Sequence, residues 1–166
     1  MPARCLTVNK EKLVATILEK LREDLALFQK AALAARAEAT DEQCMAEHKY
    51  DTRGLEASYL ARGQSRQALE IGQALEDFEK LPVRSFDASD PIDAGAVVEL
   101  KTGNETDTYF LGPRAGGTEV VCEEKEVLVI TPESPLGSQL VGRKSGEKCI
   151  LELGGRKLPY EIVRVW

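Results

Sequence analysis

The sequence has few histidines and cysteines, the residues that build zinc sites, and it has no long apolar run. It has one histidine, His48, and four cysteines, Cys5, Cys44, Cys122 and Cys149, none of them in a CxxC pair. A structural zinc site needs four such ligands brought together, so this spacing argues against zinc and indicates free thiols in a reducing cytosol. No apolar run reaches about 18 residues, and the amino terminus lacks the apolar core of a secretion signal. We therefore expect a cytoplasmic protein with no membrane contact and no intrinsic cofactor.

The chain also lacks an excess of basic charge. The 166 residues carry a formal net charge of −6, from 22 Lys and Arg against 28 Asp and Glu. A duplex-DNA binder neutralises phosphates with clustered lysine and arginine, so this balance argues against duplex DNA as a partner. An acidic protein can instead bind a basic groove on another protein, or present carboxylates to a metal.

Proline is nearly absent from the first half of the chain. Only Pro2 precedes Leu81, whereas the other six prolines and most glycines follow it, together with runs of β-branched residues. This change predicts a helical part followed by a strand-rich part. The domain boundaries are expected at 8–82 for the helical part, 83–90 for a linker and 91–166 for a compact domain, giving an α+β protein.

Two apolar stripes with alternating four- and three-residue spacing predict helices at about 9–38 and 55–81. The first stripe consists of Val14, Leu18, Leu21, Leu25, Phe28, Ala32 and Ala35. The second consists of Ala57, Ala61, Gln64, Ala68, Ile71, Leu75 and Phe78. Residues 35–54 between them are polar, which indicates the tip of an antiparallel hairpin, a coiled coil whose two stripes bury each other. A folded-back hairpin predicts a monomer, whereas parallel helix pairing would predict a dimer.

The second part offers six strand candidates separated by glycine-containing turns. They are 96–100, 106–111, 119–121, 127–130, 148–153 and 157–165, with one short helix at 138–141. Thr102-Gly103-Asn104 and Gly154-Gly155 are typical of tight hairpin turns. The aromatic residues of this part are expected in its core or at its rim: Tyr109, Phe110, Tyr160 and Trp166.

One block of the second part resembles a known family. It consists of Ser134-Pro135-Leu136-Gly137, Leu140, Gly142-Arg143-Lys144 and Gly146-Glu147. This order is similar to the carboxy-terminal domain of the GreA/GreB transcript-cleavage factors, in which a Ser-Pro-(Leu/Ile)-Gly turn leads into a short helix and two glycine turns. The resemblance covers about 92–166 and extends over 9–81 through the two-helix hairpin. It implies a β-rich domain similar in fold to the FK506-binding proteins (FKBP-like).

The resemblance also implies a partner and a function. In this family the β-rich domain sits at the rim of the secondary channel of RNA polymerase, and the hairpin enters the channel. Acidic residues at the tip help to hold a second Mg²⁺ at the polymerase active site, so that the polymerase hydrolyses backtracked RNA. The resemblance thus implies a transcription elongation factor that contacts nascent RNA indirectly. It would stimulate the polymerase's own RNA hydrolysis and would not itself be an enzyme.

The candidate site residues lie at the expected hairpin tip. They are Glu42, Glu47 and Asp51, with Asp41 next. At i, i+4 spacing on a helix, Glu47 and Asp51 would share one face and could supply both metal-binding carboxylates in the polymerase complex. The family carries an Asp three residues before the position of Glu47, whereas this chain has Cys44 there and Asp41 six residues before. The alternative is therefore a Gre-like regulator of initiation or pausing that binds the polymerase without cleavage activity.

Two other interpretations stay open. Asp51 or Thr52, with Glu56 nearby, can cap the second helix instead of acting in a site. An FKBP-like fold also suggests a prolyl isomerase or chaperone, with the coiled coil as a dimerisation arm. Fold does not imply function, however, and aromatic residues make up only 5% of the chain.

Overall fold

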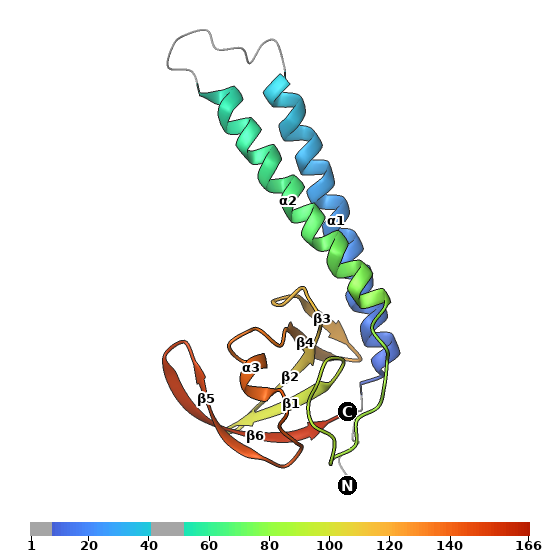
Figure 1. Ribbon diagram of the computed structural model, residues 1–166, viewed down its shortest axis with the longest axis vertical. Coiled ribbons are helices and arrows are strands. Elements are labelled where there is room, and N and C mark those ends of the chain that lie inside the picture. The colour runs from blue at the N-terminus through green and yellow to red at the C-terminus, as the bar shows by residue number, and fades with distance from the viewer. Residues whose placement is uncertain (1–7, 41–51) are drawn as a thin grey trace. The chain divides into compact units, whose positions relative to one another are not determined.

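The computed structural model describes residues 8–40 and 52–166 (Figure 1). The long helices are α1 (Lys10–Thr40) and α2 (Arg53–Glu79). The remaining elements are β1 (Val97–Thr102), β2 (Glu105–Leu111), β3 (Glu119–Cys122), β4 (Lys125–Ile130), α3 (Gly137–Leu140), β5 (Lys148–Leu153) and β6 (Arg156–Val165). The chain is thus an α+β protein, and each predicted element is confirmed with its ends within two residues of the expected ones. None of the described helices has the length and apolarity needed to cross a membrane.

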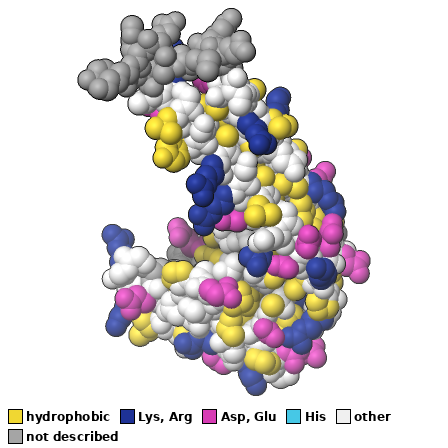
Figure 2. Space-filling view, turned by 45° about the horizontal axis from the view of Figure 1, so that its top comes forward, with side chains coloured by type: hydrophobic (Ala, Val, Ile, Leu, Met, Phe, Trp, Pro, Cys, Tyr) yellow, Lys and Arg dark blue, Asp and Glu magenta, His cyan; other side chains and the backbone are white. Residues whose placement is uncertain are grey.

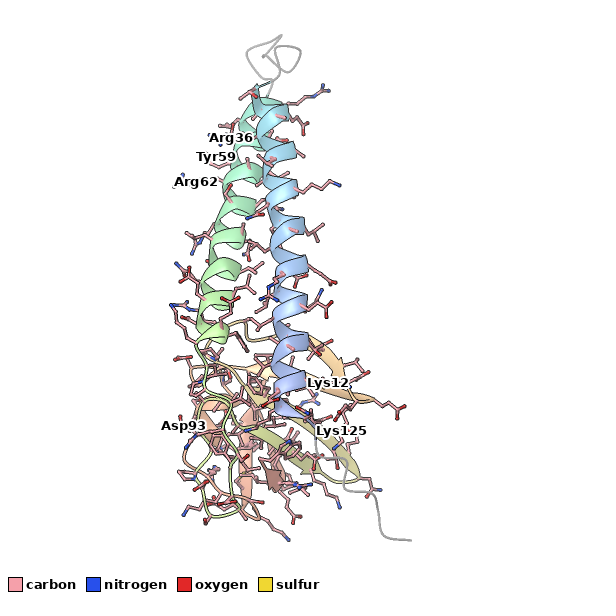
Figure 3. All side chains as sticks on the ribbon, turned by 90° about the vertical axis from the view of Figure 1, so that its right-hand side faces the viewer. Lys12, Arg36, Tyr59, Arg62, Asp93 and Lys125 are labelled. Carbon is pink, nitrogen blue, oxygen red and sulfur yellow. The ribbon has the colours of Figure 1, made fainter. Side chains whose placement is uncertain are left out.

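The two long helices form an antiparallel hairpin, as the apolar spacing predicts (Figures 1 and 3). Leu21 and Ala35 on α1 and Ala57 on α2 are buried, and the other members of the two stripes are buried or partly buried. Gln64 is the one polar member of the stripes, and its carbonyl oxygen is buried without a hydrogen-bond partner among the described residues. The hairpin therefore has a continuous but thin apolar seam with one polar defect.

Local polar contacts and a proline set the ends of the helices. The Asn9 side chain accepts a hydrogen bond from the Lys12 amide (3.1 Å), so Asn9 caps the start of α1. α2 ends just before Pro82, whose ring cannot continue a helix. By contact density the described residues divide into a head, residues 8–18 with 77–166, and a distal hairpin, residues 19–40 with 52–76. The bases of both helices thus belong to the head.

The strands form one sheet in the order β3-β4-β2-β1-β6-β5. Neighbouring strands are antiparallel except β2 and β4, which are parallel. Gly103, Gly154 and Gly155 have positive φ and close the β1–β2 and β5–β6 hairpins at the two predicted turns. The β-rich head is therefore a meandering sheet interrupted by one parallel crossover, which the sequence pattern does not predict.

The two faces of the sheet bury different residues. One face packs a cluster that includes Val98, Leu100, Ile130, Leu140 and Ile162. On the other face Phe110 stacks on Phe78 from the base of α2, with ring centroids 6.1 Å apart. These contacts make the base of the hairpin part of the core of the head.

The other three aromatic residues expected in the core or at the rim of the head, Tyr109, Tyr160 and Trp166, are partly buried. Tyr109 and Tyr160 are partly buried and pack against the first cluster. The Trp166 indole is also partly buried and donates a hydrogen bond to the Val8 carbonyl (3.2 Å).

The Ser-Pro-Leu-Gly block has a clear structural role. The Ser134 hydroxyl donates to the Thr131 carbonyl (2.7 Å) and accepts from the Gly137 amide (3.0 Å). A Cβ on Gly137 would lie 1.9 Å from the same Thr131 carbonyl oxygen, so only glycine fits. Arg143, downstream, donates to the Gln139 carbonyl (2.6 Å) at the end of α3. The block therefore fixes a tight turn into α3.

Candidate functional site

The predicted site residues lie outside the part of the chain that the structure describes. They are Asp41, Glu42, Glu47 and Asp51. Cys44 and His48, which are not among the predicted site residues, also lie outside the described part. The structure does describe the helix ends on either side of them, α1 ending at Thr40 and α2 starting at Arg53. In sequence, the acids therefore belong to the connection between α1 and α2.

The start of α2 is built by a local polar contact. The Thr52 carbonyl accepts the Glu56 amide (2.9 Å), and the Thr52 hydroxyl donates to the Glu56 carboxylate (2.9 Å). At the other helix end, the Thr40 hydroxyl donates to the Arg36 carbonyl (3.1 Å). Thr52 and Glu56 thus contact each other at the start of α2, whereas Asp51, the other residue expected as a cap, lies outside the described residues.

The outer face of α2 carries a second line of residues that the sequence analysis missed. It consists of Leu55, Tyr59, Arg62, Arg66 and Leu69, and we name it the α2 stripe. The three apolar members are 57%, 66% and 63% exposed in chain order, although such large side chains are usually buried. Figure 3 shows Tyr59 and Arg62 on the side of α2 away from α1. The signal in the sequence is the 4-3-4-3 spacing of the five positions.

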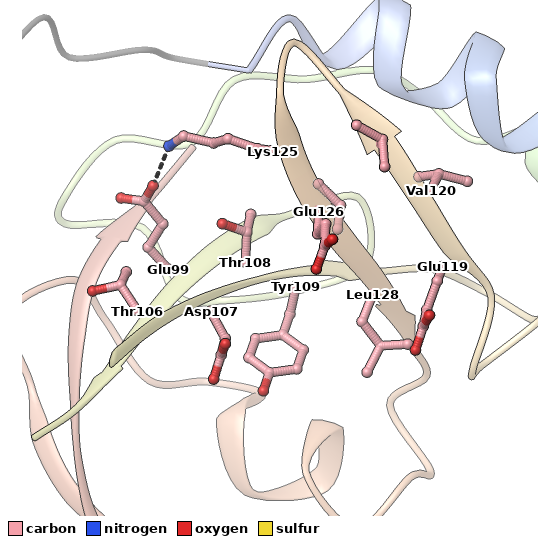
Figure 4. Close-up of a pocket in the computed structure, with 12 residues that line it drawn as sticks. Glu99, Thr106, Asp107, Thr108, Tyr109, Glu119, Val120, Lys125, Glu126 and Leu128 are labelled. Atoms are coloured by element: carbon pink, nitrogen blue, oxygen red, sulfur yellow. Dashed lines mark hydrogen bonds and ion pairs between the residues drawn. The ribbon is translucent and has the colours of Figure 1, made fainter. Parts of the chain in front are cut away.

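The head contains an acidic groove of about 840 Å³ that crosses four strands (Figure 4). Its carboxylates are those of Glu99 on β1, Asp107 on β2, Glu119 on β3 and Glu126 on β4. The Lys125 ammonium, also in the groove, is hydrogen-bonded to Glu99. One cation against four carboxylates leaves the groove with a surplus of negative charge.

Burial raises the pKa of three side chains in the strand-rich part of the head, Tyr109, Cys122 and Cys149. Burial, with a smaller effect of the Asp107 charge, raises the pKa of Tyr109 in the acidic groove to about 12, so its phenol stays protonated and can donate a hydrogen bond. Burial also raises the pKa of the Cys122 and Cys149 thiols, which keeps these two cysteines out of the nucleophilic thiolate form. Tyr109 is the one aromatic ring among the described groove residues, which gives no support to a proline-binding pocket.

Comparison with known proteins identifies the head. Residues 87–166 match the family model described as transcription elongation factor GreA/GreB, C-terminal. This range contains all six strands and α3, together with the Ser-Pro-Leu-Gly block. The match confirms the resemblance found in the sequence. A search of curated proteins finds no match.

Solved structures similar to this chain come from the same group of proteins. GreA factor homolog 1 (Gfh1) of Thermus thermophilus is 20% identical over 96% of each chain, with a TM-score of 0.37. Gfh1 of Thermus aquaticus is 21% identical over 93% of this chain and 92% of its own, with a TM-score of 0.37. A GreA/GreB factor from Nitrosomonas europaea is 22% identical over 62% of this chain and 78% of its own, with a TM-score of 0.34.

Proposed function

We propose that this chain, which belongs to the GreA/GreB family of transcription elongation factors through its carboxy-terminal domain, binds RNA polymerase and inserts its hairpin into the secondary channel. The observation that carries the proposal is the combination of a GreA/GreB head with an antiparallel hairpin whose connecting residues are acidic. The 31 residues of α1 give a rod about 46 Å long. A head held at the channel rim would therefore carry the acids deep into the channel.

In this proposal the acids act as ligands within the polymerase active site. Glu47 and Asp51 would supply carboxylate oxygens, with Glu42 and Asp41 as the next candidates. Hard oxygen ligands suit Mg²⁺, and the polymerase provides that ion and the hydrolytic chemistry. The chain would act in the cytoplasm as a monomer that brings no cofactor of its own. It would contact nascent RNA indirectly and make no contact with duplex DNA.

The tip residue Cys44 favours a second candidate function. A thiol is a soft ligand and does not replace a carboxylate at Mg²⁺. With Cys44 in place of the family's aspartate, the tip would have one carboxylate ligand fewer. The hairpin would still fill the channel and could regulate initiation or pausing without cleavage. In that case Cys44→Asp would confer RNA cleavage on a chain that lacks it, whereas in a cleaving chain it would only change the rate.

The test of the leading proposal is a cleavage assay on a backtracked complex with 3′-extruded, 5′-labelled RNA. We expect the wild-type chain to shorten the RNA, and the double variant Glu47→Ala/Asp51→Ala to lose at least about 100-fold of that rate, because its metal ligands are gone. Glu19→Ala, which removes an exposed acid from α1, is the matched control and should cleave as wild type. Binding without any shortening at saturating protein would select the second function.

A further inference from the structure

The α2 stripe lies opposite the seam of the hairpin. At 3.6 residues per turn its five positions fall within an arc of about 80°, on the side of α2 facing away from the buried stripe that contains Ala57 and Leu75. The stripe runs for about 21 Å along the helix. Packing between α1 and α2 therefore leaves it uncovered.

The composition of the stripe differs from that of an ordinary solvated helix face. Such a face carries charged and small polar residues, whereas here Leu55 and Tyr59 stand at one end and Leu69 at the other. Arg62 and Arg66 lie between them, and Arg66 forms an exposed ion pair with Glu70 (3.1 Å). Figure 2 shows hydrophobic and basic side chains next to one another on the hairpin. Clustered tyrosine, leucine and arginine are typical of protein interfaces.

A second copy of this chain does not fit the stripe. In a parallel pairing Arg62 would face Arg62 and Arg66 would face Arg66. In an antiparallel pairing centred on Arg62, the Arg62 side chains of the two copies would again face each other, while Arg66 would lie beside Tyr59 of the other copy. Like charges directly opposed across an apolar seam are destabilising, so the stripe selects a partner with the opposite charge.

Single-stranded RNA fits less well than protein. Arginine and an exposed tyrosine ring would suit phosphate and a stacked base. Leu55 and Leu69, however, give nothing to a nucleic acid, and burying them requires an apolar surface.

From this pattern we propose that the α2 stripe is a docking surface for an acidic, amphipathic ridge of RNA polymerase. The ridge would present apolar side chains to Leu55, Tyr59 and Leu69, and carboxylates to Arg62 and Arg66. This inference rests on the proposed function for the identity of the partner, and adds which face of the hairpin makes contact. The contact is only about four helical turns long, so it would be weak by itself. It would add to the binding made by the head.

The test measures binding of the full chain to purified core RNA polymerase, without nucleic acid and in a backtracked complex. We expect the triple variant Leu55→Gln/Tyr59→Gln/Leu69→Gln to raise the Kd about tenfold or more in both, because it removes the apolar anchors. Arg62→Glu should raise the Kd about fivefold or more, and its effect should shrink as salt is increased. Glutamine keeps helix propensity, and helicity by circular dichroism should match wild type.

Two matched controls separate the stripe from general surface change. Leu60→Gln alters a 53% exposed leucine of α2 that lies off the stripe, and Lys30→Glu reverses an exposed charge on α1. Both should stay within about twofold of the wild-type Kd. Wild-type affinity in the triple variant would overturn the inference while leaving the proposed function intact. A loss confined to the RNA-containing complex would assign the stripe to RNA and overturn it as well. A wild-type chain that fails to bind polymerase would remove the proposed function itself.

Discussion

At the scale of single residues, Gly137 has no room for a side chain. A methyl group there would lie 1.9 Å from the Thr131 carbonyl oxygen, which is backbone and cannot rotate away. We expect Gly137→Ala to lower the free energy of unfolding by about 2–4 kcal/mol, measured by urea denaturation. Gly63→Ala is the control, since nothing lies within 4 Å of an added Cβ on that helical glycine, and it should stabilise slightly. Equal stability of wild type and Gly137→Ala would refute the packing argument.

A second residue-scale prediction concerns Lys10 at the base of α1. The Lys10 ammonium donates a hydrogen bond to the Arg84 carbonyl (2.7 Å) and lies 4.4 Å from the centre of the Phe86 ring. The Arg84 guanidinium lies over the same ring. Burial, and then the Arg84 charge, lower the pKa of Lys10 from 10.5 to about 8. The folded state therefore releases this proton before the unfolded state does.

The sign of the pH effect follows from that difference. Between about pH 8 and pH 10.5 the unfolded chain binds more protons at Lys10, so stability from this group rises with pH and is lost as pH falls through 8. Because solvent screens this half-buried site, we expect the free energy of unfolding to increase by about 1 kcal/mol over this pH range. Thermal unfolding of the wild type and of Lys10→Met at pH 7 and pH 10 measures this increase. Only the wild type should gain the stability that Lys10 contributes at the higher pH. Parallel pH profiles would contradict the assignment.

At the scale of the elements, the seam of the hairpin has one defect. The Gln64 carbonyl oxygen is buried without a hydrogen bond from any described residue, and such a group costs about 1–3 kcal/mol. We expect Gln64→Leu to raise the stability of the hairpin by about 1–2 kcal/mol, seen as a higher midpoint in helical circular dichroism. Gln67→Leu, at an exposed position of the same helix, should change it by less than about 0.5 kcal/mol. A lower midpoint for Gln64→Leu would mean that the amide is satisfied in solution.

The elements themselves could be predicted from the sequence because their periods are local. The heptad spacing from Val14 to Ala35 specifies a helix without knowledge of its partner, and Gly154-Gly155 specifies a hairpin between adjacent strands. The parallel pairing of β2 with β4 could not be predicted in the same way. Pairing between strands that are not consecutive depends on how both faces of the sheet pack. The sequence of one segment does not contain that information.

The candidate surfaces differ in the same way: the sequence predicts those that lie within one segment and misses those that depend on tertiary packing. The acids at 41–51 were found because they interrupt an apolar period within one segment. The acidic groove could not be found, since Glu99, Asp107, Glu119 and Glu126 come from four strands and meet only in the sheet. The α2 stripe had a visible spacing, but which stripe of α2 faces α1 is decided by the whole hairpin. Leu55 and Leu75 look alike in sequence, yet one is 57% exposed and the other is buried.

At the scale of the whole molecule, the two proposals give the chain two contact surfaces for the same partner, the head and the α2 stripe. Two weak contacts joined in one chain bind far more tightly than either alone, because the second contact forms at a high effective concentration. We therefore expect the chain to displace a labelled, cleavage-competent Gre factor from RNA polymerase, with one chain bound per polymerase, whether or not its own tip supports cleavage. Fluorescence anisotropy of the labelled factor measures this displacement. The triple stripe variant should need about tenfold more protein, because it retains the head contact alone. If saturating wild-type chain left the labelled factor bound, the two proteins would occupy different sites, and a shared secondary channel would be untenable.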